Sequence, residues 1–359
     1  MSSDLDSDGD VITYSCAWDA TNNGSLDTSN ACNLSGFSFD ISTGVLSGTP
    51  NVFGIFEFHV TGTSSGGSDT KIFVVTVNDI PDHAGEWVKI PADMGGAGLP
   101  AFWVMKYEAK AWNDADADSI VDAGEVDSDG VSVALGSNVP VSVEGDVPWR
   151  SISGIDSEAE CASLGAGYAL ITNAEWMAIS RDAEVQDANW TSGTVGTGCM
   201  TRGNSGDTTC GYNGADPEGG PGRNTRAKYT LSSGDEIFDL AGNVWEWIDW
   251  DDPTNPTAGY QDGPDTTSCP GGDIENTDIL SSCGPVLATS EFDSTTGTLE
   301  KADGIGCFYG DPGTGGGVRR GGHYSRTDCS GVYYLTFYSP STYTSVTGGF
   351  RCVYRPTNP

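Results

Sequence analysis

The chain has 359 residues, more than one domain usually holds, which predicts one small domain and one of roughly 250 to 280 residues. Its 51 acidic and 16 basic residues give a net charge of -35, which argues against nucleic acid and membrane surfaces as partners because both are anionic. Charged residues make up only 19% of the chain and glycine numbers 50, which favours short strands and long loops over a helical bundle.

The N-terminus opens with MSSDLDSDGD instead of the basic and then apolar residues of a secretion leader. We therefore expect the native leader to be absent from this chain. No apolar run approaches the roughly 20 residues that a membrane-spanning helix requires, so we expect no membrane insertion.

Residues 1–80 show short segments of alternating pattern, at 37–41, 53–60 and 71–77, separated by turn residues. Such a pattern predicts a small all-β sandwich. The stretch GFSFDISTGVLSGTPNVFGIFEFHVTGTSSGGSDTKIFVVTV resembles the Ig-like, cadherin-related repeats of microbial surface proteins in its TGxxSGTP turn and closing strand. The resemblance implies a stalk without chemistry. We expect Cys16 and Cys32 to join the two early strands.

Residues 81–359 are predicted to form a second, mixed domain. NDIPDHAGE, at 78–86, contains a proline and charged residues, as domain boundaries often do. FWVMKYEAK, at 102–110, predicts a strand, and SEAECASLGAGYALITNAEWMAISRDAE, at 157–184, predicts a helix, a turn and a second helix. Glycine, asparagine, aspartate and threonine dominate after residue 185. Loops this long require a fold that tolerates them, or local disulfides or metal.

Four segments in this order resemble the sulfatase-modifying-factor family, which includes the formylglycine-generating enzymes. They are FWVMKYEAK, ALITNAEWMAISRDAE, FDLAGNVWEWIDW, and RRGGHYSRTD with GGFRCVYRP, and together they span residues 87–356. The resemblance implies an α+β fold, a loop-rich variant of the C-type lectin fold in which an N-terminal and a C-terminal strand pair and hold the loops between them.

Ten cysteines without a CxxC pair predict disulfides in an oxidising compartment rather than a zinc cluster. We therefore expect an extracellular or cell-surface protein, with cytosolic expression and free thiols as the alternative. The resemblance implies a disulfide between Cys161 and Cys352. Proximity and elimination then suggest the pairs Cys199 with Cys210, Cys269 with Cys283, and Cys307 with Cys329.

The resemblance also implies calcium at the AGNVWEW turn. The matching positions are Asp239 and Glu246, which offer carboxylates, and Gly242 and Val244, which offer backbone carbonyls. Four oxygen ligands suit a hard cation such as Ca²⁺. The alternative is that the tryptophans of this turn belong to the core and that the acids cap turns.

A second acidic stretch, DADADSIVDAGE, has aspartate or glutamate at positions 1, 3, 5, 9 and 12 of an EF-hand-like calcium loop. Position 6, where glycine is expected, is Ser119, and no amphipathic helices clearly flank the loop. A solvated acidic loop is therefore the alternative. The candidate ligands are Asp114, Asp116, Asp118, Asp122 and Glu125.

The sequence offers little for catalysis. Formylglycine-generating enzymes carry two closely spaced cysteines after the RGG element, which bind copper, whereas here HYSRTDCSGVYYLTF contains only Cys329. We therefore expect no copper and no enzymatic activity. The three histidines, His59, His83 and His323, suit neither a zinc site nor a Ser-His-Asp triad. We expect His323 to be a surface-exposed recognition residue rather than a general base.

The C-terminal segment, residues 323–347, is dense in Tyr, Ser, Thr and Gly, the residue mix of antibody paratopes. It resembles the variable region of diversity-generating-retroelement proteins, which have the same lectin-like fold and the same RGG to GFRC frame. The resemblance implies a fixed frame at Gly331, Val332, Leu335, Phe337, Pro340, Ser341 and residues 349–352. The implied varied positions, reachable from an asparagine codon by changing its adenines, are Tyr324, Ser325, Arg326, Asp328, Tyr334, Thr336, Tyr338, Thr342 and Tyr343. A plain half-buried strand is the alternative.

We therefore predict a non-enzymatic, receptor- or adhesin-type protein that presents a diversified patch on a rigid scaffold to a protein or glycan at a cell or virus surface. His323 joins the varied positions in this ligand site. The expected anchors are Tyr324, Tyr334, Tyr338 and Tyr343, because aromatic residues dominate binding hot spots. The alternatives are a divergent formylglycine-generating oxidase and a fixed, calcium-dependent glycan-binding adhesin.

Overall fold

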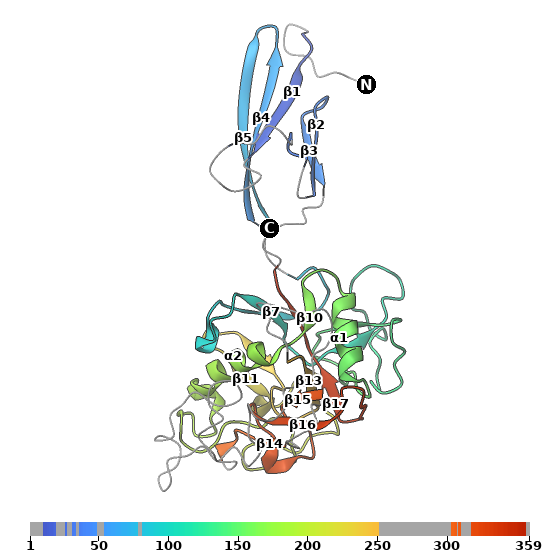
Figure 1. The fold of residues 1–359 in the computed structure, drawn as a ribbon, viewed down its shortest axis with the longest axis vertical. Coiled ribbons are helices and arrows are strands. Elements are labelled where there is room, and N and C mark those ends of the chain that lie inside the picture. Colours follow the sequence, from blue (N-terminus) through green and yellow to red (C-terminus); the bar gives the residue numbers. More distant parts are fainter. Residues whose placement is uncertain are drawn as a thin grey trace. The chain divides into compact units, whose positions relative to one another are not determined.

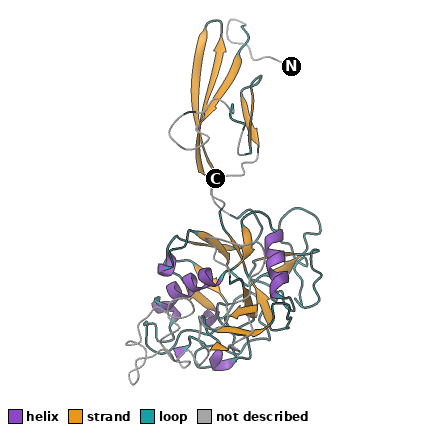
Figure 2. Ribbon diagram, viewed as in Figure 1, coloured by secondary structure: helices purple, strands orange, loops and turns teal. Residues whose placement is uncertain are grey.

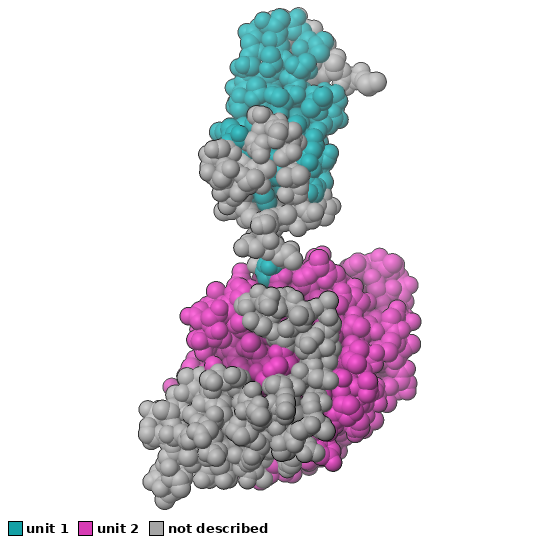
Figure 3. Space-filling model, viewed as in Figure 1, with its two compact units in different colours: residues 1–80, 356–359 teal, residues 81–355 magenta. Residues whose placement is uncertain are grey.

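The computed structural model describes residues 10–18, 26, 31–33, 36–48, 54–77, 81–250, 303–306, 308–309 and 317–356. These ranges contain mostly short β-strands, with few helices (Figures 1 and 2). The chain divides into two compact units, which Figure 3 colours separately. Unit 1 comprises Met1–Ile80 and Pro356–Pro359, and unit 2 comprises Pro81–Arg355.

Unit 1 is an all-β unit. An antiparallel sheet has the order β1-β4-β5, formed by β1 (Thr13–Trp18), β4 (Gly54–Ser64) and β5 (Gly67–Val77). A separate hairpin pairs β2 (Phe37–Asp40) with β3 (Val45–Gly48). Strand β2 alternates buried and exposed residues, as a half-buried strand must.

Aromatic side chains form the core of unit 1. Trp18 is fully buried and stacks on Phe58 with ring centroids 5.1 Å apart, and Phe37 packs edge-on against Trp18. The predicted disulfide between Cys16 and Cys32 is present. Cys32 lies in a turn rather than in a second strand, so the disulfide ties β1 to a loop.

The first sheet of unit 2 joins the two ends of the domain. Its order is β10-β18-β7-β6, formed by β10 (Tyr168–Leu170), β18 (Cys352–Tyr354), β7 (Phe102–Met105) and β6 (Trp87–Ile90). The C-terminal strand β18 therefore lies between two strands from the first half of the domain. The disulfide between Cys161 and Cys352 fixes the same junction covalently.

The strand predicted over residues 102–110 is interrupted. Strand β7 ends at Met105, and the chain resumes as β8 (Lys110–Trp112), which pairs with β9 (Val139–Val141) instead of extending the first sheet. Between the two strands, the buried carboxylate of Glu108 accepts hydrogen bonds from the side-chain amide of Asn243 and the backbone N–H of Val244. These hydrogen bonds tie the segment between β7 and β8 to the AGNVWEW turn.

The two predicted helices are present as α1 (Gly154–Ser163) and α2 (Asn173–Glu184). Ser153 caps α1 by accepting from a backbone N–H, and Thr172 opens α2 in a capping box with the glutamate three residues later. The segment predicted as a turn between them contains strand β10, which pairs with β18. No helix in the described ranges is long and apolar enough to cross a membrane.

The second sheet of unit 2 brings together the segments that carry the family resemblance. Its order is β14-β16-β15-β13-β17, formed by β14 (Phe308–Tyr309), β16 (Leu335–Ser339), β15 (Gly317–Arg320), β13 (Trp245–Ile248) and β17 (Gly348–Phe350). The other described elements are β11 (Lys228–Thr230), β12 (Glu236–Phe238), η1 (Met94–Gly96), η2 (Asp187–Asn189), η3 (Thr225–Ala227) and η6 (Thr327–Cys329).

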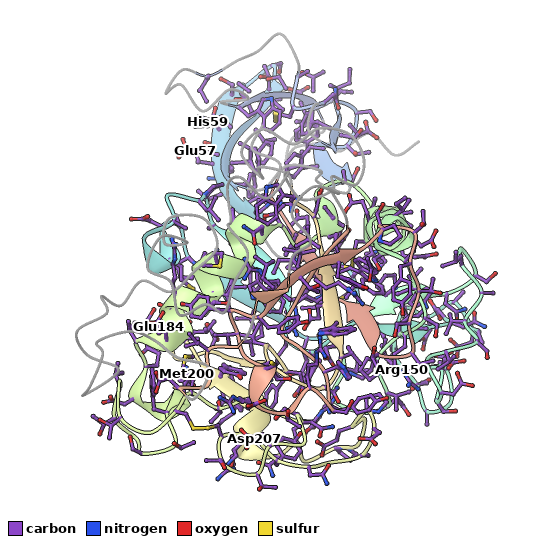
Figure 4. The ribbon with its side chains drawn as sticks, turned by 60° about the horizontal axis from the view of Figure 1, so that its bottom comes forward. Glu57, His59, Arg150, Glu184, Met200 and Asp207 are labelled. Atoms are coloured by element: carbon purple, nitrogen blue, oxygen red, sulfur yellow. A yellow bond between two sulfur atoms is a disulfide. The ribbon has the colours of Figure 1, made fainter. Side chains whose placement is uncertain are left out.

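Helix α2 fixes the chain immediately before β16. The buried indole of Trp176 donates a 2.7 Å hydrogen bond to the carbonyl of Val332. The hydroxyl of Tyr333 donates to the carboxylate of Glu184, which Figure 4 labels at the end of α2. Each net hydrogen bond contributes about 1 kcal/mol, and leaving either buried group unpaired would cost more. The start of β16 therefore has one defined position.

Candidate ligand-binding site

A cavity of about 280 Å³ opens where β13, β15 and β16 lie side by side. It combines two tyrosines, two arginines, a threonine and a tryptophan. We call it the arginine pocket, and it is lined by Trp245, Arg319, Arg326, Tyr334, Thr336 and Tyr338.

Trp245 contacts both arginines of this pocket. The guanidinium carbon of Arg319 lies 4.3 Å from the Trp245 ring centroid, and that of Arg326 lies 5.3 Å from it. Tyr334 stacks on the same indole with ring centroids 6.1 Å apart. A cation over an aromatic face is stabilised by about 0.5–2 kcal/mol, with the larger value at desolvated sites. The aromatic rings therefore hold two positive charges in one place.

Arg319 is almost completely buried, with 2% of its surface exposed. Its Nη2 donates a 2.7 Å hydrogen bond to the hydroxyl of Ser339, across the pairing of β15 with β16. Its guanidinium also lies 4.9 Å from the ring of Trp247 and 5.4 Å from the ring of Tyr343. These contacts restrict the guanidinium to one orientation.

His323 is buried, which contradicts its predicted surface exposure. Its ring packs edge-on against Trp245 with centroids 4.5 Å apart. Burial and then the positive charges of Arg326 and Arg319 lower the pKa of His323 to about 4. The imidazole is therefore neutral at pH 7, and it supports the tryptophan of the pocket instead of meeting a ligand at the surface.

The other predicted binding positions differ in exposure. Tyr338 is 77% exposed and Tyr343 is 44% exposed, as expected of contact residues. Tyr334 and Thr336 are buried, with exposures of 0% and 2%, so Tyr334 is not the exposed anchor that we predicted. Tyr334 is covered because it packs against Trp245 and Cys329. Of the remaining positions, Ser325, Asp328 and Thr342 are exposed, and Tyr324 and Arg326 are partly buried.

Sequence reasoning missed two residues of the pocket, Trp245 and Arg319. Trp245 was weighed only as a core residue, together with Trp247. In the structure Trp247 is buried and its indole donates to the carbonyl of Ile152, whereas Trp245 is only partly buried. Both side chains point to the same face of β13 by strand periodicity, so the pattern alone could not separate them.

Residues 341–347 are hydrogen-bonded to the first residue of α1 and to the loop before it. The backbone carbonyls of Ser341 and Ser345 accept from the N–H groups of Gly154 and Ser151, at 2.9 Å and 3.0 Å. Arg150, which Figure 4 labels, donates to the carbonyl of Val346 at 3.1 Å. Because these bonds involve main-chain atoms of the segment, they fix the path of residues 341–347 whatever side chains the segment carries.

The two acids of the AGNVWEW turn, predicted as calcium ligands, are both paired with arginines. Both carboxylate oxygens of the buried Glu246 accept from the guanidinium of Arg351. Asp239 is also buried, 3.5 Å from Nη2 of Arg223, and burial raises its pKa. Of the two acids of this turn, Asp239 is the one whose carboxylate oxygens have no hydrogen bond in the described part of the chain. The residues therefore fit internal ion pairs better than a four-oxygen calcium site that includes Gly242 and Val244.

The acidic loop at residues 114–125 brings part of its predicted ligand set together. Carboxylate oxygens of Asp114, Asp116 and Asp118 lie within 4.8 Å of one another. Ser119, at the position where an EF-hand loop has glycine, adopts a left-handed conformation with φ 61°. Glu125 instead accepts from the indole of Trp112 and from the backbone N–H groups of residues 115 and 122. Calcium in this loop, with Asp122 among its ligands, stays a prediction.

The three histidines lie in separate surroundings. His59 and Glu57, labelled in Figure 4, both come from β4, and Nε2 of His59 lies 2.6 Å from the Glu57 carboxylate. His83 contacts the carbonyl of Leu164 through Nε2 at 3.0 Å. In the described part of the chain, no histidine joins a cluster of metal-binding side chains.

The cysteines of unit 2 are held in disulfides where the structure describes them. The predicted pairs Cys161–Cys352 and Cys199–Cys210 are present. Cys329, the cysteine that follows the RGG element, is disulfide-bonded. The other members of the predicted pairs, Cys269, Cys283 and Cys307, lie outside the described residues.

The comparison with protein families agrees with this architecture. Residues 89–356 match the family described as sulfatase-modifying factor enzyme 1-like domain, FGE-sulfatase. A search of curated proteins finds no significant match. The family match covers the two larger sheets of unit 2 except for the first two residues of β6, together with the two helices and the arginine pocket. The chain therefore belongs to the FGE-sulfatase family, with a sulfatase-modifying factor enzyme 1-like domain as its C-terminal part.

Proposed function

We propose that unit 2 is a non-enzymatic ligand-binding domain and that its binding face is built from the C-terminal segment together with Trp245 and Arg319. The observation that carries this proposal is the arginine pocket, since four of its six lining residues come from residues 326–338. Tyr338 and Tyr343 expose aromatic surface next to it. Exposed tyrosines around a tryptophan and arginines have the composition of a binding hot spot.

The state of Cys329 favours a binder over an oxidase. A copper-dependent oxidase of this family needs two thiolates after the RGG element, and a disulfide-bonded cysteine offers none. His323 is buried and neutral beside two guanidiniums, which leaves it poorly placed as a general base. A divergent oxidase therefore remains the weaker candidate.

We further propose that the C-terminal segment is diversified, as in the variable proteins of diversity-generating retroelements. The burial pattern supports this proposal. The frame positions Val332, Leu335 and Cys352 are buried, and a Cβ on Gly331 would lie 2.2 Å from the carbonyl carbon of Ile305. Five of the varied positions are exposed and Tyr324 is partly buried. The other three, Arg326, Tyr334 and Thr336, line the pocket. Variation would then change the binding face and spare the scaffold.

We also propose an extracellular location, with unit 1 as an Ig-like stalk. The disulfides of both units support it, because such bonds persist in oxidising compartments. The partner proposed is a protein or a glycan on a cell or virus surface, and neither nucleic acid nor a membrane, because of the net charge of -35.

The test is a binding screen of the full chain against arrayed cell-surface proteins and glycans, followed by the double variant Tyr338→Ala and Tyr343→Ala. Loss of two hot-spot residues is expected to cost about 2 kcal/mol or more, roughly a thirtyfold rise in Kd. The matched control is Phe73→Ala, which removes an exposed aromatic ring from β5 of unit 1. Unchanged affinity in the double variant, or an equal loss in the control, would exclude this binding face.

Diversification has its own test. The gene is sequenced in sister cells together with its genomic neighbourhood. We expect codon differences at the varied positions, at adenines of an adjacent template copy, and a reverse transcriptase gene nearby. An invariant segment without a template copy would leave a fixed adhesin as the better account.

A further inference from the structure

The arginine pocket carries positive charge on a very acidic protein. The chain has 16 basic residues against 51 acidic ones, and two of the 16 line this single cavity. Among the described residues that line the pocket, none has a carboxylate. Asp328, the next acid along the chain from Arg326, is exposed and accepts a hydrogen bond from Thr327 at 3.1 Å. The described lining of the pocket is therefore basic, in contrast to the acidic chain as a whole.

The geometry of the pocket points to a planar anion. A guanidinium presents its N–H donors as a fixed fork that matches the two oxygens of a carboxylate. Arg319 is already oriented by Ser339 and by the ring of Trp245, so little rotamer entropy is left to lose on binding. The aromatic faces of Trp245, Tyr334 and Tyr338 can pack against the methylene groups of a short acidic side chain.

Size and charge narrow the class of ligand further. A cavity of about 280 Å³ holds one side chain, and the exposed Tyr338 and Tyr343 add contact area outside it. A partner with many acidic groups would be repelled by the net charge of -35, whereas a neutral or basic protein surface would be attracted at long range. The best occupant is therefore an isolated acid on a surface that is otherwise neutral or basic.

Resting on the ligand-binding function proposed above, we infer that the arginine pocket receives the carboxylate of a single aspartate or glutamate side chain of a protein partner whose surrounding surface is neutral or basic. The carboxylate lies between Arg319 and Arg326, and the tyrosines contact the partner around it. No covalent step is involved.

The experiment uses the full chain labelled with ¹⁵N at arginine and two short peptides, acetyl-Lys-Ser-Glu-Ser-Lys-amide and its glutamine analogue. The Nε–H resonances of Arg319 and Arg326 are followed during titration. The glutamate peptide is expected to shift both and to bind at least tenfold more tightly than the glutamine peptide. Because the glutamine peptide has the higher positive charge, unspecific attraction to the acidic protein would give the opposite order.

Variants of the pocket test whether the glutamate peptide binds there. Arg326→Gln is expected to weaken binding of the glutamate peptide at least tenfold, and Arg326→Lys, which keeps the charge but loses the fork, is expected to lie between it and the parent. Lys89→Gln is the matched control, since Lys89 of β6 is another cation that lies over a tryptophan ring, that of Trp103 in β7. It should leave the affinity unchanged. Thermal unfolding of each variant verifies that the fold is retained.

Three results would overturn the inference: equal binding of both peptides, no shift up to the solubility of the glutamate peptide, or tighter binding of N-acetylneuraminic acid than of that peptide. The last would assign the pocket to acidic sugars. If the inference fails but a ligand from the array screen still depends on Tyr338 and Tyr343, the proposed function stands without it. If the array screen also fails at these tyrosines, the proposed function fails as well.

Discussion

Replacement of Arg351 by methionine is predicted to be strongly destabilising. Its guanidinium is fully buried and is ion-paired with Glu246, and it also donates to the carbonyls of Met105 and Phe238 at 3.2 Å and 3.0 Å. The substitution leaves a buried carboxylate unpaired, which costs about 3–5 kcal/mol. The two carbonyls lose donors at about 1 kcal/mol each. The total is a large part of the stability of a typical domain.

The double variant Arg351→Met and Glu246→Met separates charge burial from packing. Without the carboxylate, the unpaired charge is gone and an apolar pair fills similar volume, so we expect at least about 2 kcal/mol to be recovered relative to Arg351→Met alone. The unpaired carbonyls of Met105 and Phe238 remain in both variants, which prevents full recovery.

Hydrogen exchange measured by mass spectrometry across a urea series is the assay, because it reports on each unit separately. Peptides from unit 2 should lose protection at lower urea in Arg351→Met, with partial return in the double variant. Peptides from unit 1 serve as the internal control and should be unchanged. A double variant that is less stable than Arg351→Met, or a single variant within 1 kcal/mol of the parent, would refute the reasoning.

Three more predictions concern the pocket, the disulfide and the acidic loop. An NMR titration should find His323 neutral down to about pH 4. Arg326→Gln should raise the pKa of His323 because it removes a neighbouring positive charge. An ordinary histidine pKa in the parent protein would contradict the buried position. Since the unfolded histidine has the higher pKa, its burial costs nothing above about pH 6.5 and destabilises the fold as pH falls below that value. Serine at both Cys161 and Cys352 should lower the stability of unit 2 by at most about 5 kcal/mol, because the bond closes a loop over a separation of 191 residues. Calorimetric titration should detect Ca²⁺ binding that EDTA reverses and that Asp116→Asn weakens at least tenfold; equal binding by the variant would exclude this loop.

The parts of the fold that were predictable have strong local signals. The capping residues Ser153 and Thr172 mark the starts of both helices, although the pattern placed the first helix from residue 157 and it begins at Gly154. The family segments place β7, β13 and β18 in one domain. Strand β10 was missed because three residues are too few to show an alternating pattern. Its strand state depends on its pairing with β18, which lies far away in the sequence.

The residues of the proposed binding face were predicted only in part. Composition identified the C-terminal segment, and the exposed Tyr338 and Tyr343 agree with it. The burial of Tyr334 and His323 depends on Trp245, which comes from another strand and was not connected to the segment by any sequence pattern. Arg319 was overlooked because strand pairing, rather than sequence proximity, places it beside Thr336.

The main-chain hydrogen bonds that hold residues 341–347 in place allow substitutions in this segment. Gly154 and Ser151 bind carbonyl oxygens that every amino acid possesses. Beyond them, β17 pairs with β13 through its backbone, and Cys352, two residues after β17, is held in a disulfide. A substitution at Tyr343 therefore leaves these hydrogen bonds intact. We expect such a substitution to change affinity and solubility more than the ability of the domain to fold.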